Sequence, residues 1–296
     1  MTTPLTQRLQ QGRGDGGIRL WLKSSAYTRQ LLKGSADADV WDSAASYLAW
    51  FSQAQGLLRP DVAVIEVGEL YDAWGARSGG LEALLGKRRN PTMALRRLLE
   101  ADAPRALLAE VLDAVAAHLR GQTPMVLAMP SPRHWLRHAN RLAHQPDDPP
   151  DPDTVDDASM YLADLLRSVS TKAVDGVLLE EAAGDAAFSA QGLQGYRSLV
   201  NIARHYRWAL ALRLPHGMPV PQRSELAGFD AVIATATLHH VDAPVPAAMG
   251  DDASEAFARA VPAPALAAGH FHFAEIPADM RPEAVLETLK VWREAA

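Results

Sequence analysis

The sequence contains no cysteine. The chain therefore forms no disulfides, and it offers neither a thiolate nucleophile nor a sulfur ligand for zinc or an iron–sulfur cluster. No GxGxxG motif follows an apolar strand, and no GxxxxGK[ST] motif occurs anywhere in the chain. Because these glycine-rich loops are what cradle phosphates, a bound dinucleotide or nucleoside triphosphate has no support in the sequence.

Positive charge is also scarce, since 29 basic residues face 35 acidic ones and the formal net charge is -6. Nucleic acids and anionic membranes attract basic surfaces, so neither is an expected partner. No apolar run approaches the roughly 18 residues that span a bilayer. The start of the chain is polar and glycine-rich, unlike a secretory signal. We therefore expect a cytoplasmic protein that acts on a small molecule.

What the sequence does contain is an alternation of short apolar runs with longer amphipathic stretches. This pattern is typical of repeated strand–helix units and a parallel sheet. It predicts an α/β fold, a (β/α)8 TIM barrel, formed as one domain by residues 1–296. The predicted strands are Ile18–Leu22, Val62–Glu66, Met125–Met129, Val177–Glu180, Ala209–Leu214, Ala231–Thr235 and Ala267–Phe273. The clearest predicted helices are Val40–Gln55, Asp102–Arg120, Val155–Ser170, Leu193–Arg207 and Pro282–Glu294.

Two segments depart from the alternation. An eighth strand is expected within Ala243–Pro264, where prolines argue against regular pairing and predict an irregular stave. Residues 144–153 are rich in proline and aspartate, which predicts a surface loop inserted into the barrel.

Between Val174 and Asp242 the same phrase occurs three times: a strand, a polar residue, a glycine and a helix. Active groups of such barrels gather at the carboxyl ends of the strands. Glu180 ends one strand, and its neighbour Glu181 points to the opposite face, so at most one of them faces the pore. His216 follows the next strand directly before Gly217, where packing seldom needs an imidazole. Glu180 and His216 are therefore candidates for acid/base work or ligation.

His270 and His272 are two residues apart and share one face of a strand. If Phe271 and Phe273 pack on the outer helices, both histidines face the pore, and His270 is the candidate for catalysis.

Further polar residues near strand ends are candidates for substrate binding. Arg133 can hold a carboxylate through its planar guanidinium group. The remaining candidates are Glu66, Glu69 and Tyr71 after the second strand, Lys23 after the first, and Arg213 in the fifth.

The order and spacing of several stretches resemble the uroporphyrinogen decarboxylase superfamily. They are Asp175–Gly184, Leu210–Gly217, Glu225–Ala234, Ala268–Phe273 and Pro282–Val285. The resemblance implies a (β/α)8 barrel related to cobalamin-independent methionine synthase and to corrinoid-linked methyltransferases, and it leaves a homodimer open. It aligns His138 with a tyrosine of the family after the third strand. The family's arginine-rich segment after the first strand is replaced here by residues 23–27, and Gly68 stands where an essential aspartate is found.

Three functions follow from the resemblance. The first is acid/base lyase chemistry of the decarboxylase type, without a cofactor, on a small carboxylated compound, aromatic or not. The second is a methyltransferase or O-demethylase that holds zinc through His216, His270 and Glu180, since the first two lie near the family's ligand positions. The third is a catalytically inactive binding or partner subunit.

Overall fold

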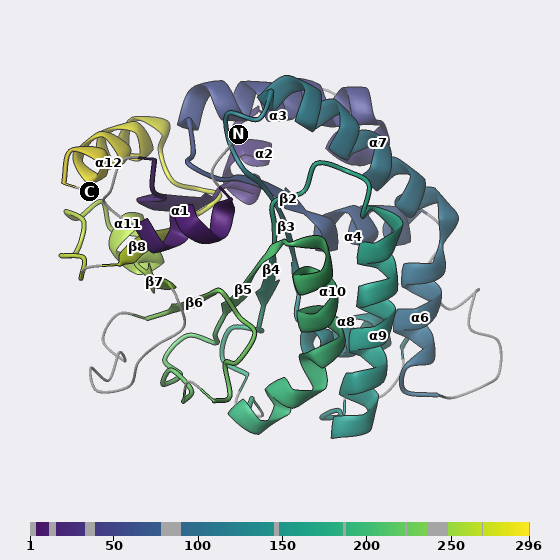
Figure 1. The fold of residues 1–296 in the computed structure, drawn as a ribbon. Coiled ribbons are helices and arrows are strands. Elements are labelled where there is room, and N and C mark those ends of the chain that lie inside the picture. Colours follow the sequence, from purple (N-terminus) through teal and green to yellow (C-terminus); the bar gives the residue numbers. More distant parts are fainter. Residues whose placement is uncertain are drawn as a thin grey trace.

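In a computed structural model, eight parallel strands form a nearly closed barrel with helices around it (Figure 1). The structure describes residues 4–11, 16–32, 39–77, 90–144, 148–185, 188–222, 224–235, 248–267 and 269–295. The strands lie in the order β1-β8-β7-β6-β5-β4-β3-β2. They are β1 (Leu20–Lys23), β2 (Ala63–Glu66), β3 (Met125–Pro130), β4 (Gly176–Glu180), β5 (Ala209–Arg213), β6 (Ala231–Ala234), β7 (Ala248–Asp252) and β8 (His270–Glu275). The predicted (β/α)8 TIM barrel is confirmed.

The helices cover the barrel unevenly, with a dense layer beside β2 to β5 and a thinner one beside β7 and β8 (Figure 1). They are α1 (Leu5–Gln11), α2 (Ser25–Leu32), η1 (Val40–Asp42), α3 (Ala44–Leu58), α4 (Val67–Arg77), α6 (Met93–Glu100), α7 (Asp102–Leu119), α8 (Pro132–Leu142), α9 (Pro152–Ser168), η2 (Ala190–Tyr196), α10 (Arg197–Tyr206), α11 (Ser254–Ala258) and α12 (Pro282–Ala295).

The inside of the barrel is filled by side chains from alternate strand positions. Trp21, Phe271 and Phe273 are its large members, with ring centroids 6.0 and 6.5 Å from Trp21 to the two phenylalanines. Small residues opposite them make room. A Cβ on Gly250 would lie 2.8 Å from the Phe271 ring, a separation that real side chains do not reach. The interior is therefore a packed core and not a pore. Leu5 of α1 packs into the same cluster.

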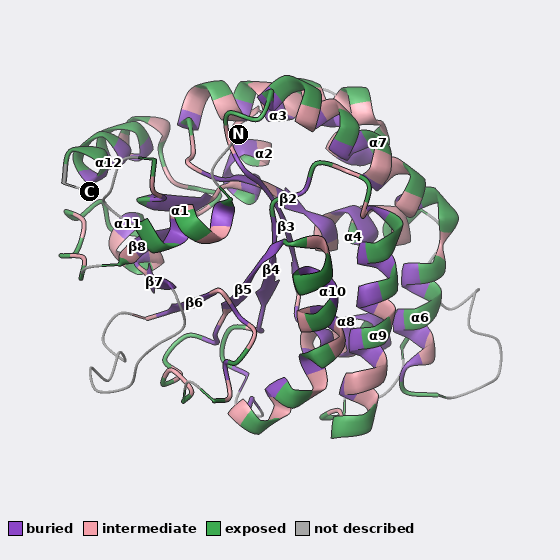
Figure 2. Ribbon diagram, in the orientation of Figure 1, coloured by how far each residue is buried: buried purple, intermediate pink, exposed green. Residues whose placement is uncertain are grey.

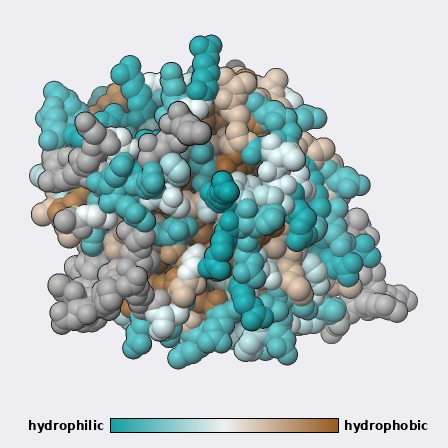
Figure 3. Space-filling model, viewed as in Figure 1, coloured by the Kyte–Doolittle hydropathy of each residue, from teal (hydrophilic) through white to brown (hydrophobic). Residues whose placement is uncertain are grey.

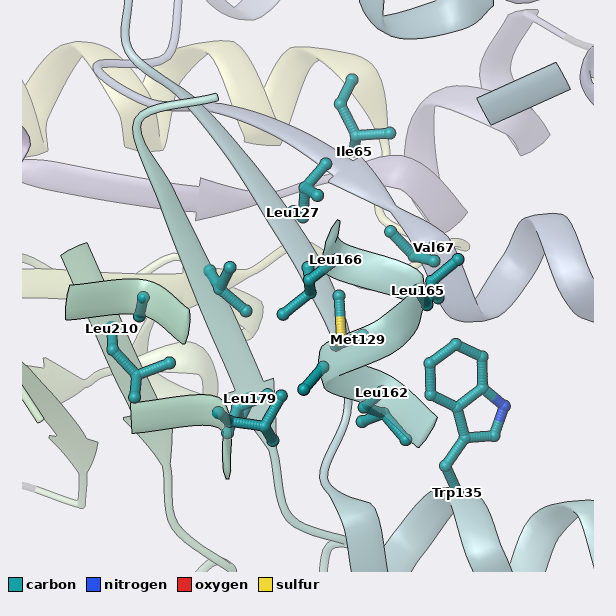
Figure 4. Packing of buried hydrophobic residues seen from close by; sticks show 14 of the residues in the cluster. Ile65, Val67, Leu127, Met129, Trp135, Leu162, Leu165, Leu166, Leu179 and Leu210 are labelled. Carbon is teal, nitrogen blue, oxygen red and sulfur yellow. The ribbon is translucent and has the colours of Figure 1, made fainter. Parts of the chain in front are cut away.

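The outer face of the strands packs against the helices. Ile65, Leu127, Met129, Leu179 and Leu210 of the strands meet leucines of α9 and Trp135 of α8 (Figure 4). Figure 2 shows the strands almost wholly buried, while most helices are buried along one side only. Each fully buried apolar side chain of this size contributes roughly 1.5–3 kcal/mol. This layer therefore accounts for much of the folding free energy.

At the amino ends of three strand pairs, an aspartate carboxylate accepts hydrogen bonds from backbone N–H groups of the adjacent strand. Asp61, Asp175 and Asp230 stand just before β2, β4 and β6. Asp61 accepts hydrogen bonds from the backbone N–H groups of Arg19 and Leu20, both at 3.1 Å. Asp175 and Asp230 accept from the N–H groups of Met125 at 2.8 Å and Leu210 at 2.9 Å. The carboxylates thus satisfy amides at the start of the preceding strands, which would otherwise lose their hydrogen bonds on burial.

The barrel has a seam between β1 and β2, which stand at the two ends of the strand order. In the described residues no backbone ladder joins them. There, Asp61 substitutes a side-chain acceptor for the missing strand partner.

The strand expected within Ala243–Pro264 is β7. The prediction that it is irregular is wrong. β7 pairs in regular parallel register with both β6 and β8. Pro262 and Pro264 follow the strand instead of interrupting it. The break in the barrel is the β1–β2 seam.

Two other predictions need correction. The connection from β5 to β6 carries turns and no helix in its described residues, because Pro215, Pro219 and Pro221 interrupt it. Of the three helices expected in the repeated phrase, the one after β4 is present as α10, and the described residues after β5 contain none. The segment after β6 lies outside the described residues. The predicted loop 144–153 ends early, since Asp151 caps α9 by accepting from the N–H of Thr154 at 2.8 Å.

The face of the molecule in Figure 3 is mainly hydrophilic, with apolar side chains showing in separate small patches. In the described part of the chain, no helix combines the length and the apolar character needed to cross a membrane.

Candidate active site

Six of the eight strands end in a charged residue. These residues are Lys23 of β1, Glu66 of β2, Glu180 of β4, Arg213 of β5, Asp252 of β7 and Glu275 of β8. In each strand the preceding residues on the same face belong to the barrel interior, for example Trp21 before Lys23 and Ala211 before Arg213. Because strand side chains alternate, all six point inward at the carboxyl end. We call this set the mouth cluster.

Glu180 lies at the centre of the mouth cluster between its two cations. Lys23 Nζ lies 2.6 Å from Glu180 Oε2, and Arg213 Nη1 lies 3.1 Å from Glu180 Oε1. Burial acts against the ionised carboxylate, but Lys23 and Arg213 outweigh it and hold the pKa of Glu180 below its ordinary value. Glu180 is therefore an anion whose two oxygens are both occupied.

Arg213 joins the remaining carboxylates to this centre. Its Nε lies 3.0 Å from Asp252 Oδ2 and its Nη1 lies 2.7 Å from Glu275 Oε2. Its Cζ also stands 4.6 Å from the centroid of the Phe273 ring, a cation–π contact. Burial alone would lower the pKa of Arg213, but Asp252, Glu180 and Glu275 raise it. The guanidinium is thus a fixed positive charge clamped on three sides.

Glu66 differs from the other carboxyl groups of the cluster. Its Oε2 lies 3.8 Å from Lys23 Nζ, and its buried Oε1 has no hydrogen-bond partner among the described residues. Burial raises the pKa of Glu66 to about 8, with Lys23 opposing the shift and Glu180 adding to it. At neutral pH Glu66 therefore holds a proton beside an ionised carboxylate. Two carboxyl groups with pKa values pushed apart are a typical arrangement for acid/base chemistry.

Glu69 lies beside this cluster, in the first turn of α4. It accepts from Ser25 Oγ at 2.9 Å and pairs with Arg29 at 2.9 Å. Burial raises its pKa, while Arg29 opposes the shift. Both of these partners belong to α2, so Glu69 anchors α2 to α4 next to the mouth.

Glu181 and Arg133 belong to a second cluster on the outer side of β4. Glu181 accepts from Ser131 Oγ at 2.8 Å and from the Tyr196 hydroxyl. Arg133 pairs with Asp185 at 3.2 Å. The prediction that at most one of Glu180 and Glu181 faces the interior is confirmed. Arg133, predicted to hold a substrate carboxylate, is instead engaged in a buried ion pair outside the mouth.

The two predicted catalytic histidines lie in different places. His216 follows β5 at the carboxyl end and is largely exposed, with Nε2 at 3.3 Å from Glu255. His270 is the first residue of β8, five positions before Glu275, which is about 16 Å along a strand. Its Nδ1 lies 2.9 Å from Asp251.

The predicted orientation of β8 is reversed. Phe271 and Phe273 fill the barrel interior. His272 faces outward, where its ring centroid lies 5.2 Å from that of Trp292 on α12, and alternation places His270 on the same outer face. Large aromatic rings fit the space left by small residues on the opposite strands. Imidazoles would leave that space unfilled.

A zinc site made by His216, His270 and Glu180 does not fit this geometry. The two histidines belong to opposite ends of their strands, and Glu180 is held by two cations. Within the described ranges no three His, Asp or Glu side chains are arranged to hold a metal ion.

Two further candidates lie away from the mouth. Tyr71 is fully buried between helices, where its ring meets Trp135 edge to face at 5.5 Å. His138 of α8 pairs with Asp72 of α4 at 2.6 Å.

Asp252 and Glu275 were not among the predicted site residues. The last predicted strand stopped at Phe273, and no strand boundaries were assigned between Ala243 and Pro264. A signal was nevertheless present, because every second residue before each acid is small or apolar: Ala248 and Gly250 before Asp252, and Phe271 and Phe273 before Glu275.

No protein-family model matches the sequence, and no curated protein matches it. Solved structures do match the fold. One is a methyltransferase from Methanosarcina mazei, with a TM-score of 0.55, 98% of each chain covered and 10% sequence identity. This likeness shows a shared TIM-barrel fold, since a fold by itself does not fix an activity. Membership in the uroporphyrinogen decarboxylase superfamily stays a prediction.

Proposed function

We propose that this protein is a barrel enzyme that transfers a methyl group from a small, uncharged methylated compound to a thiol. The observation that carries the proposal is the mouth cluster, in which Glu66 holds a proton beside the ionised Glu180. The fold shared with a methyltransferase favours methyl transfer over other acid/base reactions.

The charge balance of the mouth disfavours a carboxylated substrate, and with it the decarboxylase reaction. The cluster contains two cations, Lys23 and Arg213, and four carboxyl groups. With Glu66 protonated, its net charge is -1. Both cations are already paired, and Arg133 is occupied by Asp185. An incoming carboxylate would therefore find no unpaired cation among these residues to hold it through paired hydrogen bonds.

In the proposed reaction, Glu66 is the general acid. The thiol reacts as its thiolate, after its proton has passed to solvent. The bond from the methyl carbon to its oxygen or sulfur then breaks while a bond from the methyl carbon to the thiolate sulfur forms. The electron pair stays on the leaving atom, which takes the proton of Glu66. Lys23 then stands 3.8 Å from the newly ionised Glu66 and stabilises it. No step uses a metal.

The test is to incubate the protein with methyl ethers and methyl thioethers and a small thiol, and to detect the methylated thiol by mass spectrometry. Turnover should fall as pH rises through about 8, because Glu66 loses its proton. E66Q should lower the rate about 10²–10⁴-fold, the usual contribution of a general acid. E100Q, an exposed Glu→Gln change on α6, is the matched control and should keep the rate.

Other results would overturn the proposal. Release of CO₂ from carboxylated compounds without methyl transfer would establish the lyase. Saturable binding with no turnover of either class would establish a binding subunit.

A further inference from the structure

A small cavity of about 30 Å³ lies at the β1–β2 seam. It runs from helices α2 and α3 on the outside to Glu66 on the inside. Its lining residues are Leu22, Ser24, Ser25, Thr28, Trp50, Phe51, Ala54, Gln55, Pro60, Val62, Val64 and Glu66. Because no backbone ladder joins β1 to β2 in the described residues, side chains from both sides of the wall meet here. We call it the seam cavity.

Two lining residues each contribute a buried polar atom without a hydrogen-bond partner in the described part of the chain. They are the Nε1 donor of Trp50 and the Oε1 atom of Glu66. Buried polar atoms are almost always satisfied by protein or by ordered water. A donor and a carboxyl oxygen around one cavity therefore indicate a shared partner.

We propose that the seam cavity binds one water molecule, which accepts a hydrogen bond from Trp50 Nε1 and bonds to Glu66 Oε1. A water needs roughly 10–15 Å³ and two to four polar partners, and the cavity supplies the room and both atoms. Ser24 and Ser25 also line it.

This water gives Glu66 a path to solvent that avoids the substrate. Gln55 and Pro60 line the cavity and are partly exposed, so its outer end lies near the surface. On the inner side Glu66 faces Lys23, Glu180 and Glu275, with Glu69 and Tyr47 also close enough to interact electrostatically. If Glu66 is the general acid proposed above, the water returns its proton between turnovers while product still fills the mouth. This last step rests on the proposed function, whereas the water site does not.

The test of the water site is nuclear Overhauser spectroscopy on protein with ¹⁵N-labelled tryptophan. The indole N–H of Trp50, assigned with W50F, should show a cross-peak to a long-lived water. The indole N–H of Trp292 is the internal control. It donates to the Val261 carbonyl oxygen at 2.9 Å, and Trp292 does not line the seam cavity. A water cross-peak for neither indole, or equally strong ones for both, would overturn the site.

Infrared spectroscopy tests the link to Glu66. The carbonyl band of protonated Glu66, identified by its loss in E66Q, should shift in W50F and stay in place in W292F, since the Trp292 indole bonds to Val261 away from Glu66. An unshifted band in W50F would overturn the bridge. Both readouts work without substrate, so failure of methyl transfer leaves them valid and their failure leaves methyl transfer open.

Once turnover has been detected, the relay can be tested by kinetics. W50F should leave the rate of the first turnover unchanged, because that turnover uses the proton already on Glu66, and should lower the steady-state rate several-fold. Equal slowing of both phases would overturn the relay.

Discussion

At the amino end of the barrel, carboxylates of Asp61, Asp175 and Asp230 accept hydrogen bonds from backbone amides. At the carboxyl end, carboxyl groups surround Lys23 and Arg213 instead. The first arrangement satisfies the ends of strands, and each aspartate works alone. The second concentrates charge in one connected cluster, and it leaves one carboxyl group protonated. Barrel enzymes place stability at the amino end and chemistry at the carboxyl end, and the two sets of carboxyl groups follow this division.

The largest expected effect is on the mouth cluster. Arg213→Met should lower the free energy of unfolding by about 3–5 kcal/mol, because it leaves Asp252 buried without its cation and Glu180 with Lys23 alone. Arg77→Met removes an exposed pair with Asp42 and should cost at most about 1 kcal/mol. Urea unfolding of both variants measures the difference. Equally small losses of stability in the two variants would mean that Arg213 does not stabilise the buried carboxylates of the mouth cluster.

Stability should depend on pH through Glu66. Its pKa rises from the ordinary 4.5 to about 8 on folding, so between these values the folded chain keeps a proton that the unfolded chain has lost. The free energy of unfolding therefore falls as pH rises from 5 to 8, on the order of 2–3 kcal/mol. Glu180, whose pKa is lowered, acts only below its unfolded pKa and outside this window.

E66Q should lack this part of the pH dependence, while E100Q keeps it. Unfolding curves at several pH values measure the slope. Parallel slopes for the wild type and E66Q would show that Glu66 ionises normally.

A substitution at the amino end of the barrel should lower the free energy of unfolding and leave the turnover rate unchanged. Asp230→Ala leaves the buried N–H of Leu210 without its acceptor and should cost about 1–2 kcal/mol. Once the variant is folded, its turnover should equal that of the wild type. A selective loss of turnover would contradict the division between the two ends.

The smallest effect is expected for His270. His270→Ala removes the 2.9 Å contact with Asp251 of β7 and should cost about 1 kcal/mol, the usual net contribution of one hydrogen bond. Methyl transfer should continue at the wild-type rate, and the zinc content of the purified protein should not change. A large drop in the methyl-transfer rate or in the zinc content would show that His270 belongs to the active site.

The barrel fold was largely predictable from the sequence, because apolar runs typical of strands alternate with amphipathic stretches typical of helices along most of the chain. Glu180, Glu66, Lys23 and Arg213 were all predicted as site residues, since each ends an apolar strand. Which of them holds a proton was not predictable, because the pKa of Glu66 depends on burial and on charges from three other strands and from α4.

The errors also have physical causes. For His270 and Tyr71, polarity suggested a site while packing placed them elsewhere. In β8, two phenylalanines fit the barrel interior beside small residues such as Gly250 of the neighbouring β7. That complementarity depends on how one strand packs against another, so the pattern of β8 alone could not decide which face turned inward.

The most direct test of the account is the pKa of Glu66 itself, measured by NMR titration of ¹³C-labelled glutamate carboxyl groups and assigned with E66Q. We expect a midpoint near 8 for Glu66 and one below the ordinary value for Glu180. Midpoints near 4.5 for both groups would contradict the claim that the carboxyl end of the barrel stores a proton for chemistry.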